Sequence, residues 1–168
     1  KAYMNLGVIY TRVGCLEDAL VAFERAIGIN PEYADAFYGL GAIRYIQSEY
    51  KSALVAYKKV IQINPKHTRA RNGLNKIYAL AKSYCQQAES NYQQGDYASA
   101  YVAFEQAIRI NPDDANAYYG LGAIFLRQGD MQSALIAFKK AVEINPKDTK
   151  VQRVLGYIYD QLGGQETG

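Results

Sequence analysis

The residues of this chain that could carry chemistry are few and lie far apart in the sequence. The single histidine, His67, follows Pro65 at an expected helix start, and the two cysteines are Cys15 and Cys85. Nucleophilic catalysis needs a base within hydrogen-bond reach of the nucleophile, and no spacing here indicates such a pair. We therefore expect His67 to be a solvated loop residue and Cys85 to be a buried or inert thiol.

Two acidic pairs, Glu17-Asp18 and Asp113-Asp114, could in principle act as general acid and base. Each pair stands where a helix is expected to begin, and negative charge is favourable there because it offsets the helix dipole. The sequence contains no Cys/His cluster suited to zinc and no glycine-rich phosphate loop. We accordingly predict no catalytic residue, no metal site, no cofactor and no enzyme activity.

Composition and charge are those of a folded protein with an uneven surface. Apolar residues make up 49% of the chain and charged residues 21%, and no uncharged stretch is long enough to span a membrane. Two cysteines suggest no disulfide framework, so we expect a reducing compartment, the cytoplasm. The net charge is +3, yet no Asp or Glu occurs between Tyr50 and Ala88, a stretch that holds Lys51, Lys58, Lys59, Lys66, Arg69, Arg71, Lys76 and Lys82.

A repeated unit accounts for most of the sequence. The tripeptide Ile-Asn-Pro occurs four times, and its prolines are 34, 47 and 34 residues apart. Before each one stands an amphipathic run, such as "DALVAFERAI", in which an Ala and an aromatic residue four positions on share one helical face. We expect the Asn to end each helix in the left-handed conformation and the Pro to stop it. Each unit is thus predicted to be two antiparallel helices joined by a short turn.

These units resemble tetratricopeptide repeats (TPRs), whose pattern places an aromatic residue, Leu-Gly and a second aromatic on the first helix, then Ala, an aromatic residue, Ala and Pro on the second. Two units match in full, through Tyr3, Leu6, Gly7, Tyr10, Ala19, Phe23, Ala26 and Pro31, and through Tyr118, Leu121, Gly122, Phe125, Ala134, Phe138, Ala141 and Pro146. The second unit departs from the pattern at Arg44 and the third at Gln87. Val151 to Gly163 resembles one more first helix, the usual cap.

The resemblance implies an all-α fold, a superhelix (α-solenoid) of two repeat pairs joined by a long helix and closed by a capping helix. The expected divisions are residues 1–66 for the first pair, 67–94 for the connecting helix, 95–147 for the rest of the second pair, 148–163 for the cap and 164–168 for a tail. The connecting segment carries 13 extra residues and an apolar stripe from Ala70 to Tyr92, which predicts one helix of about 26 residues. A break at Asn72-Gly73 is the alternative.

Two glycines stand one residue apart in "AFYGLGAIRYI" and again in "AYYGLGAIFLR". In the family, the residue at Gly41 and Gly122 lies where paired helices approach closely, and Ala53 and Ala134 are expected opposite. Gly39 and Gly120 are expected to face the inner surface and to leave a shallow slot for a partner. The alternative is that Gly is merely tolerated there.

The resemblance implies that first-helix residues form a concave face that binds a partner segment. The binding residues expected on this face are Asn5, Tyr38, Gly39, Ala42, Tyr45, Arg69, Asn72, Lys76, Tyr119, Gly120, Ala123, Arg127 and Tyr157. Chaperone-binding members hold a C-terminal carboxylate with a defined set of basic and Asn residues, of which only Arg69 is found here, so capture of a chaperone tail is not expected.

The sequence therefore predicts a protein–protein interaction scaffold or adaptor that binds a protein or peptide, with an acidic segment steered to Arg69, Asn72 and Lys76. Two alternatives remain: the interaction domain of a larger enzyme, or a nucleic-acid-binding repeat that uses the basic centre, residues 51–82. Self-association is also open, because the first helix exposes an apolar end that a second copy could cover.

Overall fold

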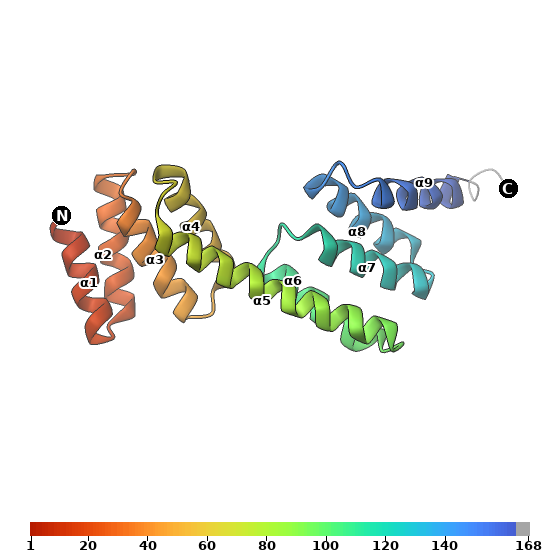
Figure 1. The fold of residues 1–168 in the computed structure, drawn as a ribbon, viewed down its shortest axis with the longest axis horizontal. Coiled ribbons are helices and arrows are strands. Elements are labelled where there is room, and N and C mark those ends of the chain that lie inside the picture. Colours follow the sequence, from red (N-terminus) through yellow and green to blue (C-terminus); the bar gives the residue numbers. More distant parts are fainter. Residues whose placement is uncertain (164–168) are drawn as a thin grey trace. The chain divides into compact units, whose positions relative to one another are not determined.

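The computed structural model describes residues 1–163, and these residues are built from helices without any strand (Figure 1). The predicted all-α fold is confirmed. The predicted tail, residues 164–168, lies outside the described part. Nine helices follow one another within it: α1 (Ala2–Val13), α2 (Leu16–Ile29), α3 (Ala34–Ile46), α4 (Tyr50–Ile63), α5 (Thr68–Gln93), α6 (Tyr97–Ile110), α7 (Ala115–Gln128), α8 (Met131–Ile144) and α9 (Thr149–Gly163).

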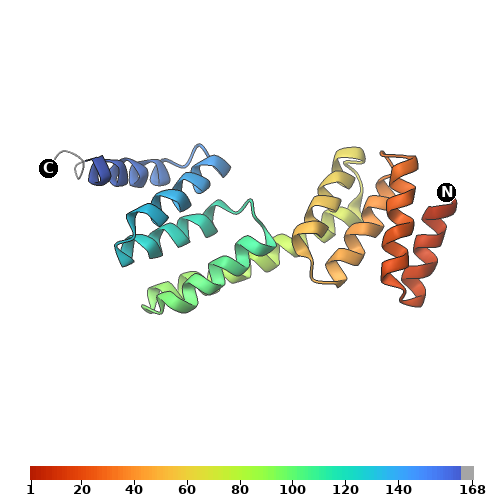
Figure 2. The ribbon, with the colours of Figure 1, turned by 180° about the vertical axis from the view of Figure 1, so that it is seen from behind.

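The chain divides into two compact units within α5. Unit 1 is Lys1–Ala79 and contains α1 to α4 with the first part of α5, and unit 2 begins at Leu80 and contains the rest. In unit 1, α1 lies antiparallel beside α2 and α3 beside α4 (Figure 2). Helix α5 runs without interruption for 26 residues, so the predicted long helix is present and a break at Asn72-Gly73 is not observed.

Each repeat closes around an aromatic ring on its second helix. In unit 1, Ala19 and Phe23 of α2 are buried together with Ala36 and Ile43 of α3. In unit 2, Phe138 of α8 is only 1% exposed and packs in one cluster with residues of α9. Burial of such a ring contributes about 2–3 kcal/mol relative to exposure, so these rings are the main apolar contribution of each second helix.

The ends of the second helices differ from the prediction. Asn30, Asn64, Asn111 and Asn145 have φ between −136° and −127°, which is extended rather than left-handed. Each precedes a proline, whose ring excludes helical backbone at the residue before it. In the first three, the side-chain Oδ1 accepts a hydrogen bond of 3.1–3.3 Å from the backbone N–H two residues on. The expected left-handed Asn caps were therefore wrong.

Left-handed backbone occurs instead in the turn inside each repeat. Gly14, Gly95 and Gly129 have φ of 83°, 82° and 79°. The equivalent residue of the second repeat is Ser48, with φ 62°, and it is the one non-glycine residue with positive φ in the described chain. Since the Cβ atom of an L-residue crowds the backbone in this conformation, Ser48 is a strained position.

Replacing Ser48 with Gly should raise the free energy of unfolding by about 1 kcal/mol. The Cβ atom of an L-residue in the left-handed conformation costs roughly 1–2 kcal/mol, and the larger backbone entropy that Gly loses on folding cancels part of the gain. Thermal melting followed by circular dichroism should show a Tm about 2–4 °C higher. Gly129→Ser is the matched control and should lower the Tm. A Tm that does not rise in Ser48→Gly would contradict the assignment of strain.

Candidate functional site

A cavity of about 340 Å³ opens on unit 1 between α3, α4 and α5, and we call it the α3–α5 groove. No Asp or Glu is among the described residues that line it. Its lining consists of Tyr38, Ala42, Tyr45 and Ile46 of α3, Tyr57 of α4, and Arg69, Asn72, Gly73 and Lys76 of α5. Six of these were predicted for the inner face, and the structure brings them together: Tyr38, Ala42, Tyr45, Arg69, Asn72 and Lys76.

Three aromatic rings, tilted against one another, form one wall of the α3–α5 groove. The Tyr38 ring centroid lies 5.9 Å from that of Tyr57 and 5.1 Å from that of His67. Tyr57 itself is 4% exposed, and burial, followed by the nearby Tyr38 and Tyr45, raises the pKa of its hydroxyl to about 12. The groove therefore has the neutral phenol of Tyr57 in its aromatic wall.

His67 anchors the start of α5 instead of lying free in a loop. Its Nδ1 accepts a hydrogen bond of 3.1 Å from the backbone N–H of Ala70, and its Nε2 lies 3.4 Å from Oδ1 of Asp35. The side chain is 11% exposed. The prediction of a solvated residue was wrong because the first N–H groups of a helix need acceptors, and the His67 ring supplies one while it packs beside the Tyr38 ring.

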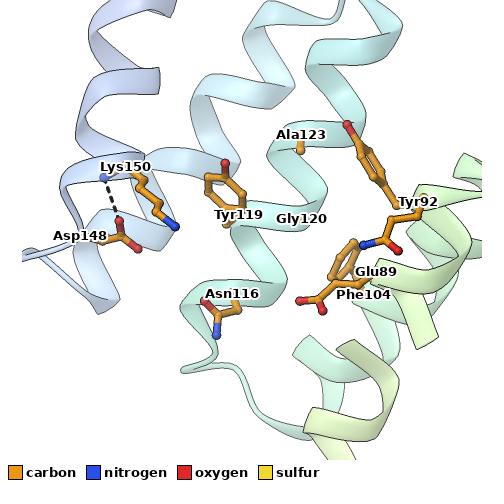
Figure 3. A pocket seen from close by; sticks show the side chains of 10 residues that line it. Glu89, Tyr92, Phe104, Asn116, Tyr119, Gly120, Ala123, Asp148 and Lys150 are labelled. Carbon is orange, nitrogen blue, oxygen red and sulfur yellow. Dashed lines mark hydrogen bonds between the residues drawn. The ribbon is translucent and has the colours of Figure 1, made fainter. Parts of the chain in front are cut away.

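A second cavity of about 340 Å³ lies in unit 2 between α5, α7 and α9, and we call it the α5–α9 groove (Figure 3). Its charges are mixed, since Glu89 and Asp148 line it together with Lys150. The backbone N–H of Lys150 donates to Oδ1 of Asp148 over 2.9 Å. The remaining lining residues are Tyr92, Gln93, Phe104, Asn116, Tyr119, Gly120 and Ala123, among them the predicted Tyr119, Gly120 and Ala123.

The other predicted binding residues lie elsewhere. Tyr157 shares an adjoining depression with Tyr119 and Arg153. Arg127 is exposed but turned toward α6, where its guanidinium donates to the Tyr97 hydroxyl over 2.9 and 3.2 Å. Asn5 is exposed on α1 and is absent from the described lining of both grooves.

The predicted slots at Gly39 and Gly120 are not present, because aromatic rings occupy that space. A Cβ atom on Gly39 would lie 2.5 Å from Cζ of Phe23, and one on Gly120 would lie 2.1 Å from Cζ of Phe104. Each ring belongs to the second helix of the preceding repeat. These two glycines therefore allow successive repeats to approach, and sequence reasoning missed this because the ring comes from the neighbouring repeat.

Gly41 and Gly122 are packing glycines as predicted, but the predicted contact was wrong. A Cβ atom on Gly41 would lie 2.8 Å from Tyr57, and one on Gly122 would lie 2.7 Å from Phe138. The close neighbour is thus the aromatic ring of the same repeat and not the expected Ala53 or Ala134.

The thiol of Cys85 is held in its neutral form. The side chain is 6% exposed, and its Sγ lies 3.8 Å from Oδ2 of Asp114. Burial, then the charges of Asp114 and Glu89, raises the pKa of the thiol to about 12. Among residues 1–163, no group of three His, Cys, Asp or Glu side chains is placed to hold a metal ion, and no helix is long and apolar enough to cross a membrane.

Comparison with known families agrees with this geometry. Residues 1–33 and 34–67 each match a family model described as tetratricopeptide repeat, and residues 85–149 match a second model with the same description. The chain belongs to the tetratricopeptide repeat family. The TPR matches leave out residues 68–84, which form the greater part of α5.

Solved TPR structures are similar to this chain at low identity. A crystal structure of MamA protein is 22% identical and covers 96% of this chain and 81% of its own, with a TM-score of 0.48. MamA from Desulfovibrio magneticus RS-1 is 22% identical, with coverage of 99% and 86% and a TM-score of 0.45. YrrB, titled a TPR protein with an unusual peptide-binding site, is 20% identical, with coverage of 90% and 89% and a TM-score of 0.44. No curated protein matches the sequence.

Gly120→Ala should lower the free energy of unfolding by about 1–3 kcal/mol, since its Cβ would overlap the Phe104 ring and overpacking has costs of this size. The matched control is Gly156→Ala in α9, where nothing lies within 4 Å of the added Cβ, and it should stabilise by roughly 0.5–1 kcal/mol. Urea denaturation measures both. In a Phe104→Leu background the loss should shrink, and an equal loss in both backgrounds would refute the proposed contact.

At pH 8, iodoacetamide should modify the exposed Cys15 readily and Cys85 at least about 100-fold more slowly, because only the thiolate reacts and the pKa of Cys85 is raised. Mass spectrometry of tryptic peptides at successive times separates the two sites. In denaturant the two thiols should react at similar rates. Similar rates in the folded protein would show that Cys85 is accessible and ionised.

Proposed function

We propose that this protein is an interaction scaffold whose α3–α5 groove binds an acidic segment of a partner protein. One observation carries the proposal: Arg69 and Lys76 line the same groove as Tyr38 and Tyr45. A groove that combines cations with aromatic surface suits a segment in which carboxylates flank an apolar side chain.

The spacing on α5 supports recognition of carboxylates. Arg69, Asn72 and Lys76 follow one another at steps of three and four residues, so their side chains project from one helical face. A carboxylate at Arg69 can accept two parallel hydrogen bonds, and charge-assisted bonds of this kind are about twice as strong as neutral ones. The other basic side chains between Lys51 and Lys82 add long-range attraction that speeds association.

The tyrosines supply the remaining contact energy. Tyr38 and Tyr45 lose few rotatable bonds on binding, and each offers an apolar face with a polar tip. Because Tyr38 is already held between two other rings, a partner would meet a wall that needs little ordering. Such preorganisation lowers the entropic cost of association.

The α5–α9 groove favours a different ligand. Glu89 and Asp148 in its lining would repel a strongly acidic segment, and Lys150 adds a single positive charge. We infer that this groove takes a neutral or mixed-charge segment, so that the two units of the chain select chemically different sequences. An adaptor that joins two different partners needs two sites with different specificity of this kind.

Nucleic-acid binding is the second candidate, since the basic stretch could contact phosphates while tyrosines stack on bases. Two further expectations from the sequence are independent of the groove: a role as the interaction domain of a larger enzyme, and residence in the cytoplasm.

A fluorescein-labelled acidic decapeptide, with Glu and Asp around a central Leu, should bind the full chain in a polarisation assay. Its affinity should fall about tenfold or more in the double variant Arg69→Glu/Lys76→Glu, because two charge pairs become repulsive. A peptide with Gln and Asn in place of the acids should bind weakly to both proteins.

The matched control is Lys51→Glu/Lys59→Glu, which changes the net charge equally at exposed positions of α4 outside the groove. Equal losses in the two double variants would show that the attraction is diffuse and would contradict a groove site. A single-stranded oligouridylate that binds more tightly than the peptide, with a steep salt slope, would favour the nucleic-acid function instead.

A further inference from the structure

A third groove lies on unit 2, between α6, α7 and α8, and we call it the α6–α8 groove. Its volume is about 650 Å³, within the range of roughly 300–1,000 Å³ that is typical of small-molecule sites. It shares no described lining residue with the α5–α9 groove of the same unit. The apolar and aromatic side chains that line it are Tyr101 of α6, Tyr118, Leu121 and Phe125 of α7, and Ile136 and Ala137 of α8.

Unit 1 is built differently at the same place in its repeats. Arg44 of α3 occupies the repeat position that Phe125 has on α7. Its Nη1 donates to Oε2 of Glu49 over 2.9 Å. Beside it, Nε2 of Gln47 donates to Oε1 of Glu17 over 3.1 Å. A polar network therefore joins α2, α3 and the start of α4 in unit 1.

Unit 2 has an aromatic pair instead of this network. The ring centroids of Tyr101 and Phe125 are 5.9 Å apart, at an interplanar angle of 73°, and the Tyr101 hydroxyl donates to Oε1 of Glu105 over 2.7 Å. Asp130, which corresponds to Glu49, caps α8 by accepting from the backbone N–H of Ser133 over 3.0 Å. Since the repeats of unit 1 pack with a polar residue in place of Phe125, packing alone does not require an aromatic lining here.

The charges of the α6–α8 groove favour an anion. Lys139, Lys140 and Glu143 line it, and Nζ of Lys140 donates to Oε2 of Glu143 over 2.9 Å. Lys139 is exposed, with its Nζ 5.5 Å from the centroid of the Tyr159 ring, and it has no carboxylate partner among residues 1–163. One lysine charge is thus left for a ligand, beside an apolar and aromatic surface.

We propose that the α6–α8 groove binds a small carboxylic acid with an aromatic body. The rings of Tyr101 and Phe125 provide a contact surface for this body. The carboxylate pairs with Lys139, because a charge-assisted hydrogen bond is stronger than a neutral one. A cationic ligand would meet two lysines, and a neutral one would leave Lys139 without a partner. This site is separate from the α3–α5 groove and does not depend on the function proposed for it.

Biphenylacetate is a suitable probe, and its neutral amide is the matched compound without a charge. Titration of the full chain, followed through backbone amide NMR shifts, should show saturable changes confined to α6, α7 and α8. The acid should bind about fivefold or more tightly than the amide at low salt, since one charge pair near the surface has an effect of this size. Added salt should reduce that difference because it screens the pair.

The apolar part of the site is tested by Phe125→Gln/Ile136→Ser. Both compounds should bind about tenfold or more weakly to this variant, because two contact surfaces are lost. The matched control Val21→Gln/Val55→Ser changes exposed aliphatic residues of α2 and α4 and should bind like the wild type. Ile136→Ser alone changes a residue that is 69% exposed, so it should fold normally and still weaken binding about threefold.

The charged part of the site is tested by Lys139→Gln. In this variant the acid should bind no more tightly than the amide, while the affinity of the amide stays the same. Lys59→Gln removes an equal charge from an exposed position of α4 and should leave both affinities unchanged. Arg69→Glu/Lys76→Glu should also leave them unchanged, which separates this site from the α3–α5 groove.

Four results would overturn the proposal. They are shifts that do not saturate, shifts that centre on either of the other grooves, equal affinities of the acid and the amide, and unchanged binding in Phe125→Gln/Ile136→Ser. A dimer seen by sedimentation that this variant abolishes would also overturn it, because the groove would then be covered by a second copy.

Discussion

The contact on which the structure depends is an aromatic ring that separates successive first helices. Phe23 meets Gly7 of its own repeat and Gly39 of the next, and a Cβ atom on either glycine would lie within 2.6 Å of the ring. Tyr57 stands in the same way between Gly41 and Gly73. Each glycine costs its helix roughly 1 kcal/mol relative to Ala, and the burial of the ring, at about 2–3 kcal/mol, outweighs that cost. In these two repeats, stacking is possible because both first helices present bare backbone to one ring.

This contact also determines what kind of surface the inner face can be. Since the rings fill the space beneath the first helices, the side chains that flank the packing glycines, such as Tyr38 and Ala42, are left to form the groove lining. The packing ring can itself be part of a groove. Tyr57 adds a hydroxyl to the lining of the α3–α5 groove, whereas Phe104, which lines the α5–α9 groove, has no hydroxyl. Differences between the two grooves thus arise at positions that leave the packing of the repeats unchanged.

The features that the sequence predicted well are those set by contacts within one helix or one repeat. The two-helix units, the long α5 and the shared face of Arg69, Asn72 and Lys76 follow from spacing along the chain. The errors concern contacts with a neighbour. Gly39 could be understood only from Phe23 of the preceding repeat, and the packing of His67 only from Tyr38 and Asp35. The Asn caps failed for a local reason, the proline that follows each of them.

Helix α5 shows how the sequence ends one stack of repeats and begins another without a break in the chain. Its first half carries Ala70 and Ile77, both 0% exposed within unit 1, whereas its second half has Ser83 and Ser90 at the corresponding repeat positions, both exposed. A continuous helix can belong to both units because backbone hydrogen bonds do not depend on which face is buried. The side chains at these few positions therefore decide whether a first helix continues a stack or begins one, and helical propensity has no part in that choice.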